Sequence, residues 1–534
     1  MTHRFSLLFF PLLMALFLVA HQTRAQTVAD YRDVTEMTQA IDALDGALDG
    51  RVRVFTAGRS EQGREIKVIH LRQRQSGQLQ RIRAKPAYLV ECAMHAREWA
   101  AAEICMRMVE DFVDLYRVQP LLEALNISGP NTGLSDILDA VDIYVIPMVN
   151  PDGRAFDDQN GGDPFQFGPG SGWRKNRGEY PCISPPGQQT GIDLARNFSN
   201  GWDGRDASRV CADRKYRGPH PFAAKENRVL RKLVNNLLIG QSLSVHGNTQ
   251  GFDRLAAPAF NSVPVQNFLT QYNALATPGL ILGNGPGGGG NGQFPAWALN
   301  TADTAGQPDE GTRRGINAYM VELPVNNYAA SPYRLNRPGT QNGFRPTNPT
   351  FFRDMRGPML AGFLYMARQA ANPWRPIDPI TFAPAPCSGS ACNSDFALVG
   401  SKIVAASSSG LVLGTRDGAL RMSNTPDPHE YLRAGQYAPQ VLVQNASLSG
   451  GATSRTVRFR LDRLNGPLGS STQMIPLNGS TSRTVTLAPG ESRLISGPAM
   501  PIRNGNEYRW TITLTGSDRV SLNDSHVFRF RAHR

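Results

Sequence analysis

One stretch of the sequence constrains the fold more than any other, a short apolar run followed closely by a helical pattern. Residues 87–90 predict a buried strand, and residues 100–112 have helical spacing and strong helix formers. His95 and Glu98 lie in the connection between them. Ligand sites of open α/β sheets gather at the carboxyl ends of strands. An imidazole and a carboxylate suit Zn²⁺, but a catalytic zinc site needs a third ligand and a base.

The remaining pattern up to residue 373 alternates strands with helices. Strands are predicted over 65–71, 142–149, 241–245 and 317–323, and helices over 34–48, 223–238 and 357–371. This alternation predicts an α/β fold with a mainly parallel sheet covered by helices. His246 directly follows one predicted strand, and Glu322 lies near the end of another.

The length of 534 residues is too great for one ordinary hydrophobic core, so two domains are expected. Residues 374–386 are rich in proline and predict a linker after an α/β domain spanning 26–373. From 387 to 534, short alternating strands are separated by Gly, Pro, Asn and Ser turns, which predicts an immunoglobulin-like β-sandwich. This second domain could contact a surface, steer substrate or brace the first domain.

Residues 1–25 predict a signal peptide. Arg4 is followed by an apolar run over 5–20, and small residues stand at the cleavage positions before Gln26. No later segment reaches membrane-spanning length. The mature protein is therefore expected to be secreted or periplasmic, without integral membrane association. A retained N-terminal anchor is the alternative.

The charge pattern bears on possible partners. The formal net charge of +12 becomes +10 when Arg4 and Arg24 are removed with the signal peptide. The sequence has no block of Lys and Arg, no zinc-knuckle spacing and no alternation of aromatic with basic residues, so nucleic-acid binding is not expected. The positive charge favours anionic surfaces or acidic substrates only in general terms.

Six cysteines in an exported chain are expected to pair. Two candidate pairs close a short loop or bracket a polar stretch: Cys387 with Cys392, and Cys182 with Cys211. Cys92 and Cys105 flank the loop that holds the candidate metal ligands. Their positions fit a disulfide and a pair of reduced, buried thiols equally well.

The candidate metal ligands share a position at or just after a predicted strand end: His95, Glu98 and His246, joined by Glu322. One sheet could therefore bring all four to a single edge. Two histidines and one glutamate form a catalytic zinc set that leaves a coordination position for water. The sequence thus predicts one Zn²⁺ per chain.

Several motifs occur together in the order and approximate spacing of one enzyme family: His-Ala-Arg-Glu-Trp (95–99), Asn-Pro-Asp-Gly (150–153), Trp-Arg-Lys-Asn-Arg (173–177), Gly-Ile-Asp-Leu-Ala-Arg-Asn-Phe (191–198), Val-His-Gly (245–247), Trp297-Ala and Val-Glu-Leu (321–323). Through them, residues 31–371 resemble the zinc carboxypeptidase A/B family. The resemblance implies a mixed, mostly parallel sheet with helices on both faces. It also implies hydrolysis of peptide or protein substrates at the C-terminus.

The resemblance assigns roles to individual residues. His95, Glu98 and His246 would hold zinc, and Glu322 would be the general base, consistent with zinc lowering the pKa of water. Arg174 would stabilise the oxyanion of the tetrahedral intermediate.

Three further roles follow from the same resemblance. Asp193 would fix the tautomer of a zinc-ligand histidine, and Arg97 would reach towards upstream substrate residues. Arg196 would pair with the terminal carboxylate of the substrate. A disulfide between Cys182 and Cys211 would also match the family.

The chain departs from the family pattern at three places. Ala195 stands where an asparagine usually precedes the carboxylate-binding arginine. The closing tyrosine of the family would fall in the run Gly287–Gly290, which contains none. No acid lies near Pro295, the region that usually sets side-chain preference, so an apolar or small terminal residue is expected rather than Lys or Arg.

These departures leave two alternatives to a secreted zinc carboxypeptidase. One is a zinc endopeptidase or amidase that acts on internal or cell-wall peptide bonds. The other is a secreted binding protein on an inactive peptidase scaffold, against which the retained ligands and Glu322 argue.

Overall fold

The computed structural model describes most of both predicted domains. It covers residues 31–73, 84–124, 133–159, 172–180, 190–204, 206–247, 251–253, 262–284, 292–299, 315–324, 350–375, 377–378, 396–405, 420–422, 430–433, 435–447, 450–465, 473–476, 481–503, 506–516 and 524–533. Outside these ranges lie several predicted features: the signal peptide over 1–25, Cys182, Cys387, Cys392, the glycine run 287–290 and linker residues 379–386.

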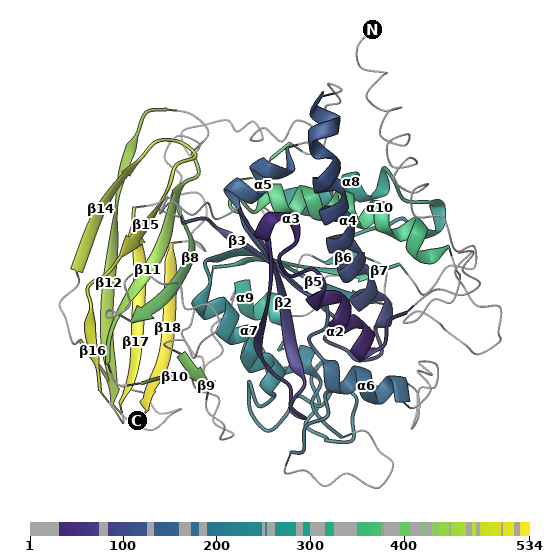
Figure 1. Ribbon diagram of the computed structural model, residues 1–534. Helices are drawn as coiled ribbons and strands as arrows, with labels where there is room; N and C mark the ends of the chain where they lie inside the picture. The colour runs from purple at the N-terminus through teal and green to yellow at the C-terminus, as the bar shows by residue number, and fades with distance from the viewer. Residues whose placement is uncertain are drawn as a thin grey trace.

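A twisted mixed sheet forms the centre of the first unit (Figure 1). Its strands lie side by side in this order: β1 (Val52–Arg59), β2 (Glu65–Leu71), β4 (Asp142–Ile146), β3 (Ala87–Cys92), β5 (Ile239–Gly247), β7 (Asn317–Leu323) and β6 (Gly251–Asp253). The four strands from β4 to β7 pair in parallel, and both edges pair antiparallel. The predicted mixed sheet is confirmed. The edge strand β1 returns directly into β2 through a short turn, a connection too short for a parallel crossover.

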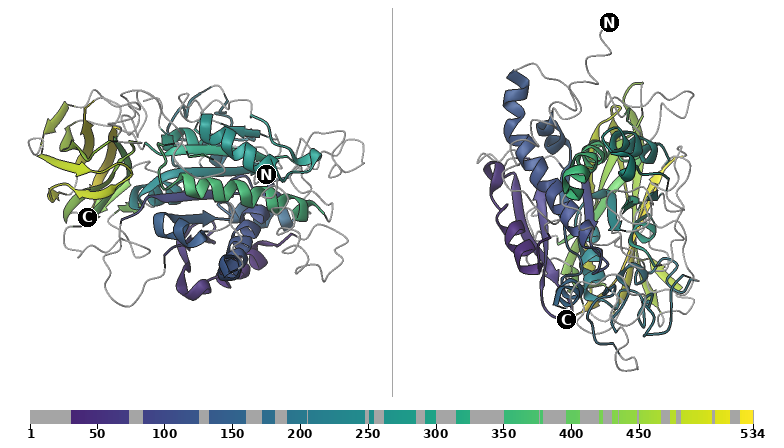
Figure 2. Two further views of the ribbon diagram at one scale, coloured as in Figure 1. Left: turned by 90° about the horizontal axis from the view of Figure 1, so that it is seen from above. Right: turned by 90° about the vertical axis from the view of Figure 1, so that its right-hand side faces the viewer.

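Helices cover both faces of this sheet (Figures 1 and 2). One core contains residues of α2 (Val34–Asp42), α4 (Trp99–Ala124), α5 (Leu134–Ala140), α8 (Ser262–Asn273) and α10 (Phe351–Gln369). The other contains residues of α7 (Lys225–Asn236) and α9 (Phe294–Leu299). Strand β3 contributes side chains to both cores, because Tyr88 and Val90 enter the first core and Leu89 enters the second. Shorter elements complete this unit: α3 (Ala47–Gly50), α6 (Pro151–Gln159) and the 3₁₀ turns η1 (Leu194–Arg196) and η3 (Pro278–Leu280).

The C-terminal part is built of β-strands, as predicted. One sheet contains β15 (Ser492–Ser496), β11 (Gly435–Asn445), β16 (Met500–Ile502) and β8 (Phe396–Ala405). A second contains β13 (Gln473–Pro476), β12 (Thr453–Asn465), β14 (Thr481–Leu487), β17 (Glu507–Thr515), β18 (Ser525–His533), β10 (Glu430–Arg433) and β9 (Leu420–Met422). The two sheets share one hydrophobic core, in which Leu398 and Val441 of the first meet Phe459 and Trp510 of the second. An immunoglobulin-like arrangement stays a prediction.

The two units pack against each other through β8 and the start of β5 (Figure 1). Val399 and Leu442 join the same hydrophobic core as Leu238 and Trp374. Two glycines bring the backbones together. A Cβ atom built on Gly240 would lie 2.7 Å from Val399 O, and one built on Gly400 would lie 2.7 Å from Leu238 C.

Polar contacts reinforce this interface. Arg375 Nη1 donates to Ser447 O at 2.8 Å, and Gln444 Nε2 donates to Ala371 O at 2.9 Å. The contact lies at the amino end of β5, whereas His246 lies at its carboxyl end. The second unit therefore supports the sheet from the end opposite the candidate site. Within the described ranges, no helix has the length and apolar character to cross a membrane.

Candidate metal centre

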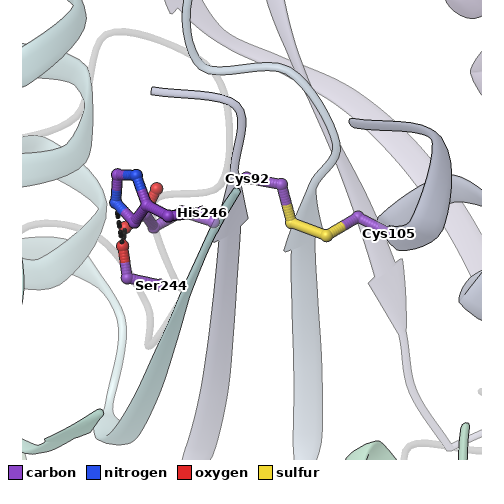
Figure 3. Close-up of a disulfide and its surroundings, with 5 residues drawn as sticks. Cys92, Cys105, Ser244 and His246 are labelled. Atoms are coloured by element: carbon purple, nitrogen blue, oxygen red, sulfur yellow. Dashed lines mark hydrogen bonds between the residues drawn. A yellow bond between two sulfur atoms is a disulfide. The ribbon is translucent and has the colours of Figure 1, made fainter. Parts of the chain in front are cut away.

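The loop from β3 to α4 carries two of the predicted metal ligands. Ala93 opens it with a φ of 53°, a left-handed conformation that non-glycine residues rarely adopt. His95 and Glu98 follow, and α4 begins at Trp99. Cys92 and Cys105 form a disulfide with a Cα–Cα distance of 6.6 Å, which resolves the pairing that the sequence left open (Figure 3). The disulfide therefore links the end of β3 to the second turn of α4, across the loop.

The structure brings His95, Glu98 and His246 together as predicted. His95 Nδ1 lies 2.6 Å from Glu98 Oε1, and His246 Nδ1 lies 3.0 Å from Glu98 Oε2. The two Nδ1 atoms are 3.2 Å apart. All three side chains are buried, and their ligand atoms lie within 4.8 Å of one another.

This arrangement fits a zinc ion. Two ring nitrogens held at about 2.0–2.1 Å from a tetrahedral zinc would lie about 3.3 Å apart, close to the observed separation. Two Nδ1 lone pairs that face each other and a buried carboxylate repel unless a proton or a metal cation lies between them. The donor set and its geometry thus match the predicted metal ligands.

The electrostatics of the three residues also favour a bound cation. Burial disfavours the ionised Glu98, but His95 and His246 outweigh it and hold the pKa of Glu98 well below its usual range. Burial also opposes the charged form of His246, yet Glu98 raises the pKa of His246 to about 9. Burial and then Arg174 lower the pKa of His95. The negative potential that favours a proton on His246 would equally favour a metal cation.

Asp193 connects a candidate metal ligand to a cationic side chain. His95 Nε2 lies 3.2 Å from Asp193 Oδ1, and Arg174 Nε donates to Asp193 Oδ2 at 2.9 Å. Burial disfavours the carboxylate, but Arg174 and His95 hold the pKa of Asp193 well below its usual range. An ionised Asp193 accepts the Nε2–H proton of His95 and leaves Nδ1 free to bind a metal. Arg174 Nη1 lies 3.3 Å from His95 Nδ1, so the guanidinium stands beside the candidate metal position.

Asp193 also begins the turn that carries Arg196. Its Oδ1 accepts a hydrogen bond from Ala195 N at 3.1 Å and so caps η1. Arg196 Nε donates to Asp206 O at 2.9 Å, and its Nη2 pairs with the Asp206 carboxylate. The guanidinium is thereby held in one orientation.

One cavity of about 340 Å³ collects nearly all the predicted residues. It is lined by His95, Arg97, Glu98, Arg174, Arg196, His246 and Glu322. Asp193, the eighth predicted residue, is fully buried behind Arg174. Glu322 and His246 reach the cavity because they are register partners on β7 and β5. Burial, followed by Arg174, lowers the pKa of Arg97 to about 10.

The family departures can be placed in the same cavity. Ala195 and Pro295 both line it, so the position that lacks the asparagine faces the candidate site. Apolar side chains complete the wall near Pro295: Met94, Phe294 and Met320. The run Gly287–Gly290 lies outside the described residues. Cys211 is disulfide-bonded, and its predicted partner Cys182 also lies outside them.

Asn150, the first residue of the Asn-Pro-Asp-Gly motif, has a role that the motif alone does not reveal. Asn150 Nδ2 donates to Met94 O at 3.2 Å and to Lys175 O at 3.1 Å. These carbonyls precede His95 and follow Arg174, so Asn150 fixes the two segments against each other. Its Oδ1 accepts from Gly153 N at 3.0 Å, which explains the spacing of the Asn-Pro-Asp-Gly motif.

Comparison with known proteins agrees with the site. Residues 37–255 match the family model described as zinc carboxypeptidase. Metallocarboxypeptidase A of Trichophyton rubrum is 29% identical over 227 residues, covering 42% of this chain and 46% of that protein. Human carboxypeptidase B is 30% identical over 171 residues, covering 31% of this chain and 34% of that protein. The matched region thus spans less than half the length of these curated relatives.

A solved structure is also similar. Carboxypeptidase A of Helicoverpa armigera matches 68% of this chain and 80% of its own, with a TM-score of 0.46 and 19% sequence identity.

Proposed function

Residues 37–255 match the zinc carboxypeptidase family model, and from this premise we propose that the protein hydrolyses C-terminal peptide bonds of peptides or proteins. The observation that carries the proposal is the convergence of two histidines, a glutamate ligand and a second glutamate in one cavity. Homology alone would fit an inactive scaffold. Retention of the general base beside the metal ligands supports an enzyme.

Glu322 is the proposed general base. It lies on β7 directly beside His246, within the same cavity. A zinc ion held by His95, Glu98 and His246 would lower the pKa of water and polarise the substrate carbonyl. Glu322 would take a proton from the attacking water and deliver it to the leaving amine.

Arg174 is the proposed oxyanion stabiliser. Although burial disfavours its charge, Asp193 and Glu98 outweigh this effect and raise the pKa of Arg174. A fixed cation with a second N–H facing the cavity can donate to negative charge that develops on the carbonyl oxygen. Asp193 would hold both Arg174 and the His95 ring in place.

Arg196 is the proposed partner of the terminal carboxylate, and Arg97 would contact upstream residues. Anchoring of Arg196 by Asp206 reduces the entropy lost on binding substrate. The apolar wall formed by Met94, Phe294 and Met320 supports a preference for apolar or small terminal side chains.

The localisation and the second domain complete the proposal. A disulfide at Cys92 and Cys105 is typical of an oxidising compartment, which supports a secreted or periplasmic protein. The continuous core between the units favours a bracing role for the β-sandwich domain over 387–534, joined by the linker 374–386.

One observation favours a second candidate function. Ala195 lines the cavity beside Arg196, so one polar partner of a terminal carboxylate is replaced by a methyl group. A weaker grip on free C-termini is compatible with cleavage of internal or cell-wall amide bonds.

A single peptide offered in two forms tests both candidates. Mass spectrometry would follow the peptide with a free C-terminus and with a C-terminal amide, with a Glu322→Gln protein as the blank. We expect sequential loss of residues from the free form only. Internal cleavage of both forms would establish the endopeptidase or amidase. Silence in both forms, with zinc bound, would contradict the proposed hydrolysis of such peptides.

A further inference from the structure

A buried polar chain lies behind His246. Ser244 lies two residues before His246 on β5, and Glu91 is its register partner on β3. His246 Nε2 lies 3.1 Å from Ser244 Oγ (Figure 3). Ser244 Oγ donates in turn to Glu91 Oε1. Glu91 and Ser244 have no exposed surface, and His246 is only 3% exposed.

The chain sets the direction of each hydrogen bond. The hydroxyl proton of Ser244 goes to Glu91, so the Ser244 oxygen accepts from His246 Nε2–H. A proton fixed on Nε2 leaves the Nδ1 lone pair directed towards Glu98 and His95. This is the tautomer and orientation that a metal ligand needs.

The buried position of Glu91 lowers the stability of the fold. Burial raises the pKa of Glu91 to about 8, and a carboxyl group inside a central strand destabilises the fold relative to an apolar residue. Such a group calls for an explanation. The hydrogen-bond chain to His246 provides one.

We propose that Glu91 and Ser244 are positioning residues that orient His246 for zinc binding. His95 is oriented directly by Asp193, whereas His246 is oriented through the Ser244 hydroxyl. The inference rests on the proposed role of His246 as a zinc ligand and goes beyond the roles already assigned.

Zinc affinity of purified full-length protein tests the inference without relying on activity. Competition with a fluorescent chelator would compare wild type with Ser244→Ala and with Glu91→Leu, which removes the acceptor of the Ser244 hydroxyl. We expect dissociation constants roughly 10- to 100-fold higher in both variants, the range typical for lost partners of ligating histidines. Because the three residues act in series, the double variant should bind zinc about as weakly as Ser244→Ala.

Ser242→Ala is the matched control. Ser242 is buried on the same strand and face, and within the described residues its Oγ has no hydrogen-bond partner. This variant should retain wild-type affinity. The visible absorption spectrum of the cobalt-loaded proteins adds a readout of ligand geometry, and it should shift in Ser244→Ala but not in Ser242→Ala. Glu91→Gln keeps an oxygen that can accept from Ser244, so this conservative variant should stay near wild-type affinity.

The outcomes distinguish failure of the positioning role of Glu91 and Ser244 from failure of the proposed function. Wild type that binds zinc, with Ser244→Ala and Glu91→Leu matching Ser242→Ala, would overturn the inference and leave the proposed function intact. Wild type that binds no zinc would overturn both.

Discussion

His246 on β5 and Glu322 on β7 are register partners in two neighbouring parallel strands. Their neighbours along the strands, Val245 and Val321, point into the hydrophobic core on the other face of the sheet. His246 and Glu322 therefore project from the same face into one cavity. The sheet register therefore sets the distance between a candidate metal ligand and the proposed base. No loop has to move to bring the two groups together.

Replacement of the proposed base should abolish turnover without loss of metal. We expect Glu322→Gln to lower kcat by about 10²- to 10⁴-fold, the usual contribution of general base catalysis. Zinc content, measured by elemental mass spectrometry, should stay at the wild-type level. Glu65→Gln, on β2 beside the edge strand β1, is the matched control and should leave kcat unchanged. A Glu322→Gln protein with normal turnover would contradict the assigned role.

Removal of the guanidinium of Arg196 should affect substrates with a free C-terminus. A hydrogen bond to a charged group is worth about 1.5–3 kcal/mol, so KM should rise by about 10- to 100-fold in Arg196→Gln. Steady-state kinetics on one peptide series measures this rise. Arg209→Gln removes an arginine whose side chain is 72% exposed, and it should leave KM unchanged. Equal KM in Arg196→Gln and wild type would place the terminal carboxylate elsewhere.

Glu226 should make stability depend on pH. Burial, and then the nearby Glu61, raise the pKa of Glu226 from 4.5 to about 7. Between these values the folded state keeps a proton that the unfolded state releases, so the free energy of unfolding falls as pH rises. The slope from this group is at most about 1.4 kcal/mol per pH unit.

Denaturant unfolding of wild type and Glu226→Gln at pH 5 and pH 7 measures this effect. The variant cannot ionise, so its stability relative to wild type should increase towards pH 7. Two pH profiles that run parallel would show that Glu226 does not titrate in this window.

The contact between the two units should tolerate no side chain at Gly400. Its Cβ would lie 2.7 Å from the backbone at Leu238, so Gly400→Val should lower the free energy of unfolding by about 1–3 kcal/mol. Gly451→Val is the matched control, because a Cβ there has nothing within 4 Å. Thermal unfolding compares the two variants. If both variants match wild type, the two units are not packed as described.

Much of the site could be predicted because its ligands stand at strand ends. His95, His246 and Glu322 each follow or end an apolar run, and a sheet with parallel central strands brings such positions to one edge. The Val34–Leu48 pattern was less informative. It predicts one helix, but Gly46 adopts a φ of 83° between two separate helices, α2 and α3.

The partners of these ligands could not be read from sequence spacing. Glu91 and Ser244 are far apart in sequence and meet only because of the register between β3 and β5. Spacing along the chain does not reveal which residues of two separate strands become register partners. The Cys92–Cys105 pairing was open for a similar reason, since it depends on how α4 leaves the strand.

The paired glycines at the interface limit how this protein can be recombined. Gly240 and Gly400 allow the backbones of the two units to touch. A Cβ atom at either position would clash with the backbone of the other unit. A chimaera that joins this β-domain to a different hydrolase would need a glycine at the position equivalent to Gly240. The C-terminal domain is therefore not an exchangeable module but one that fits a specific partner surface.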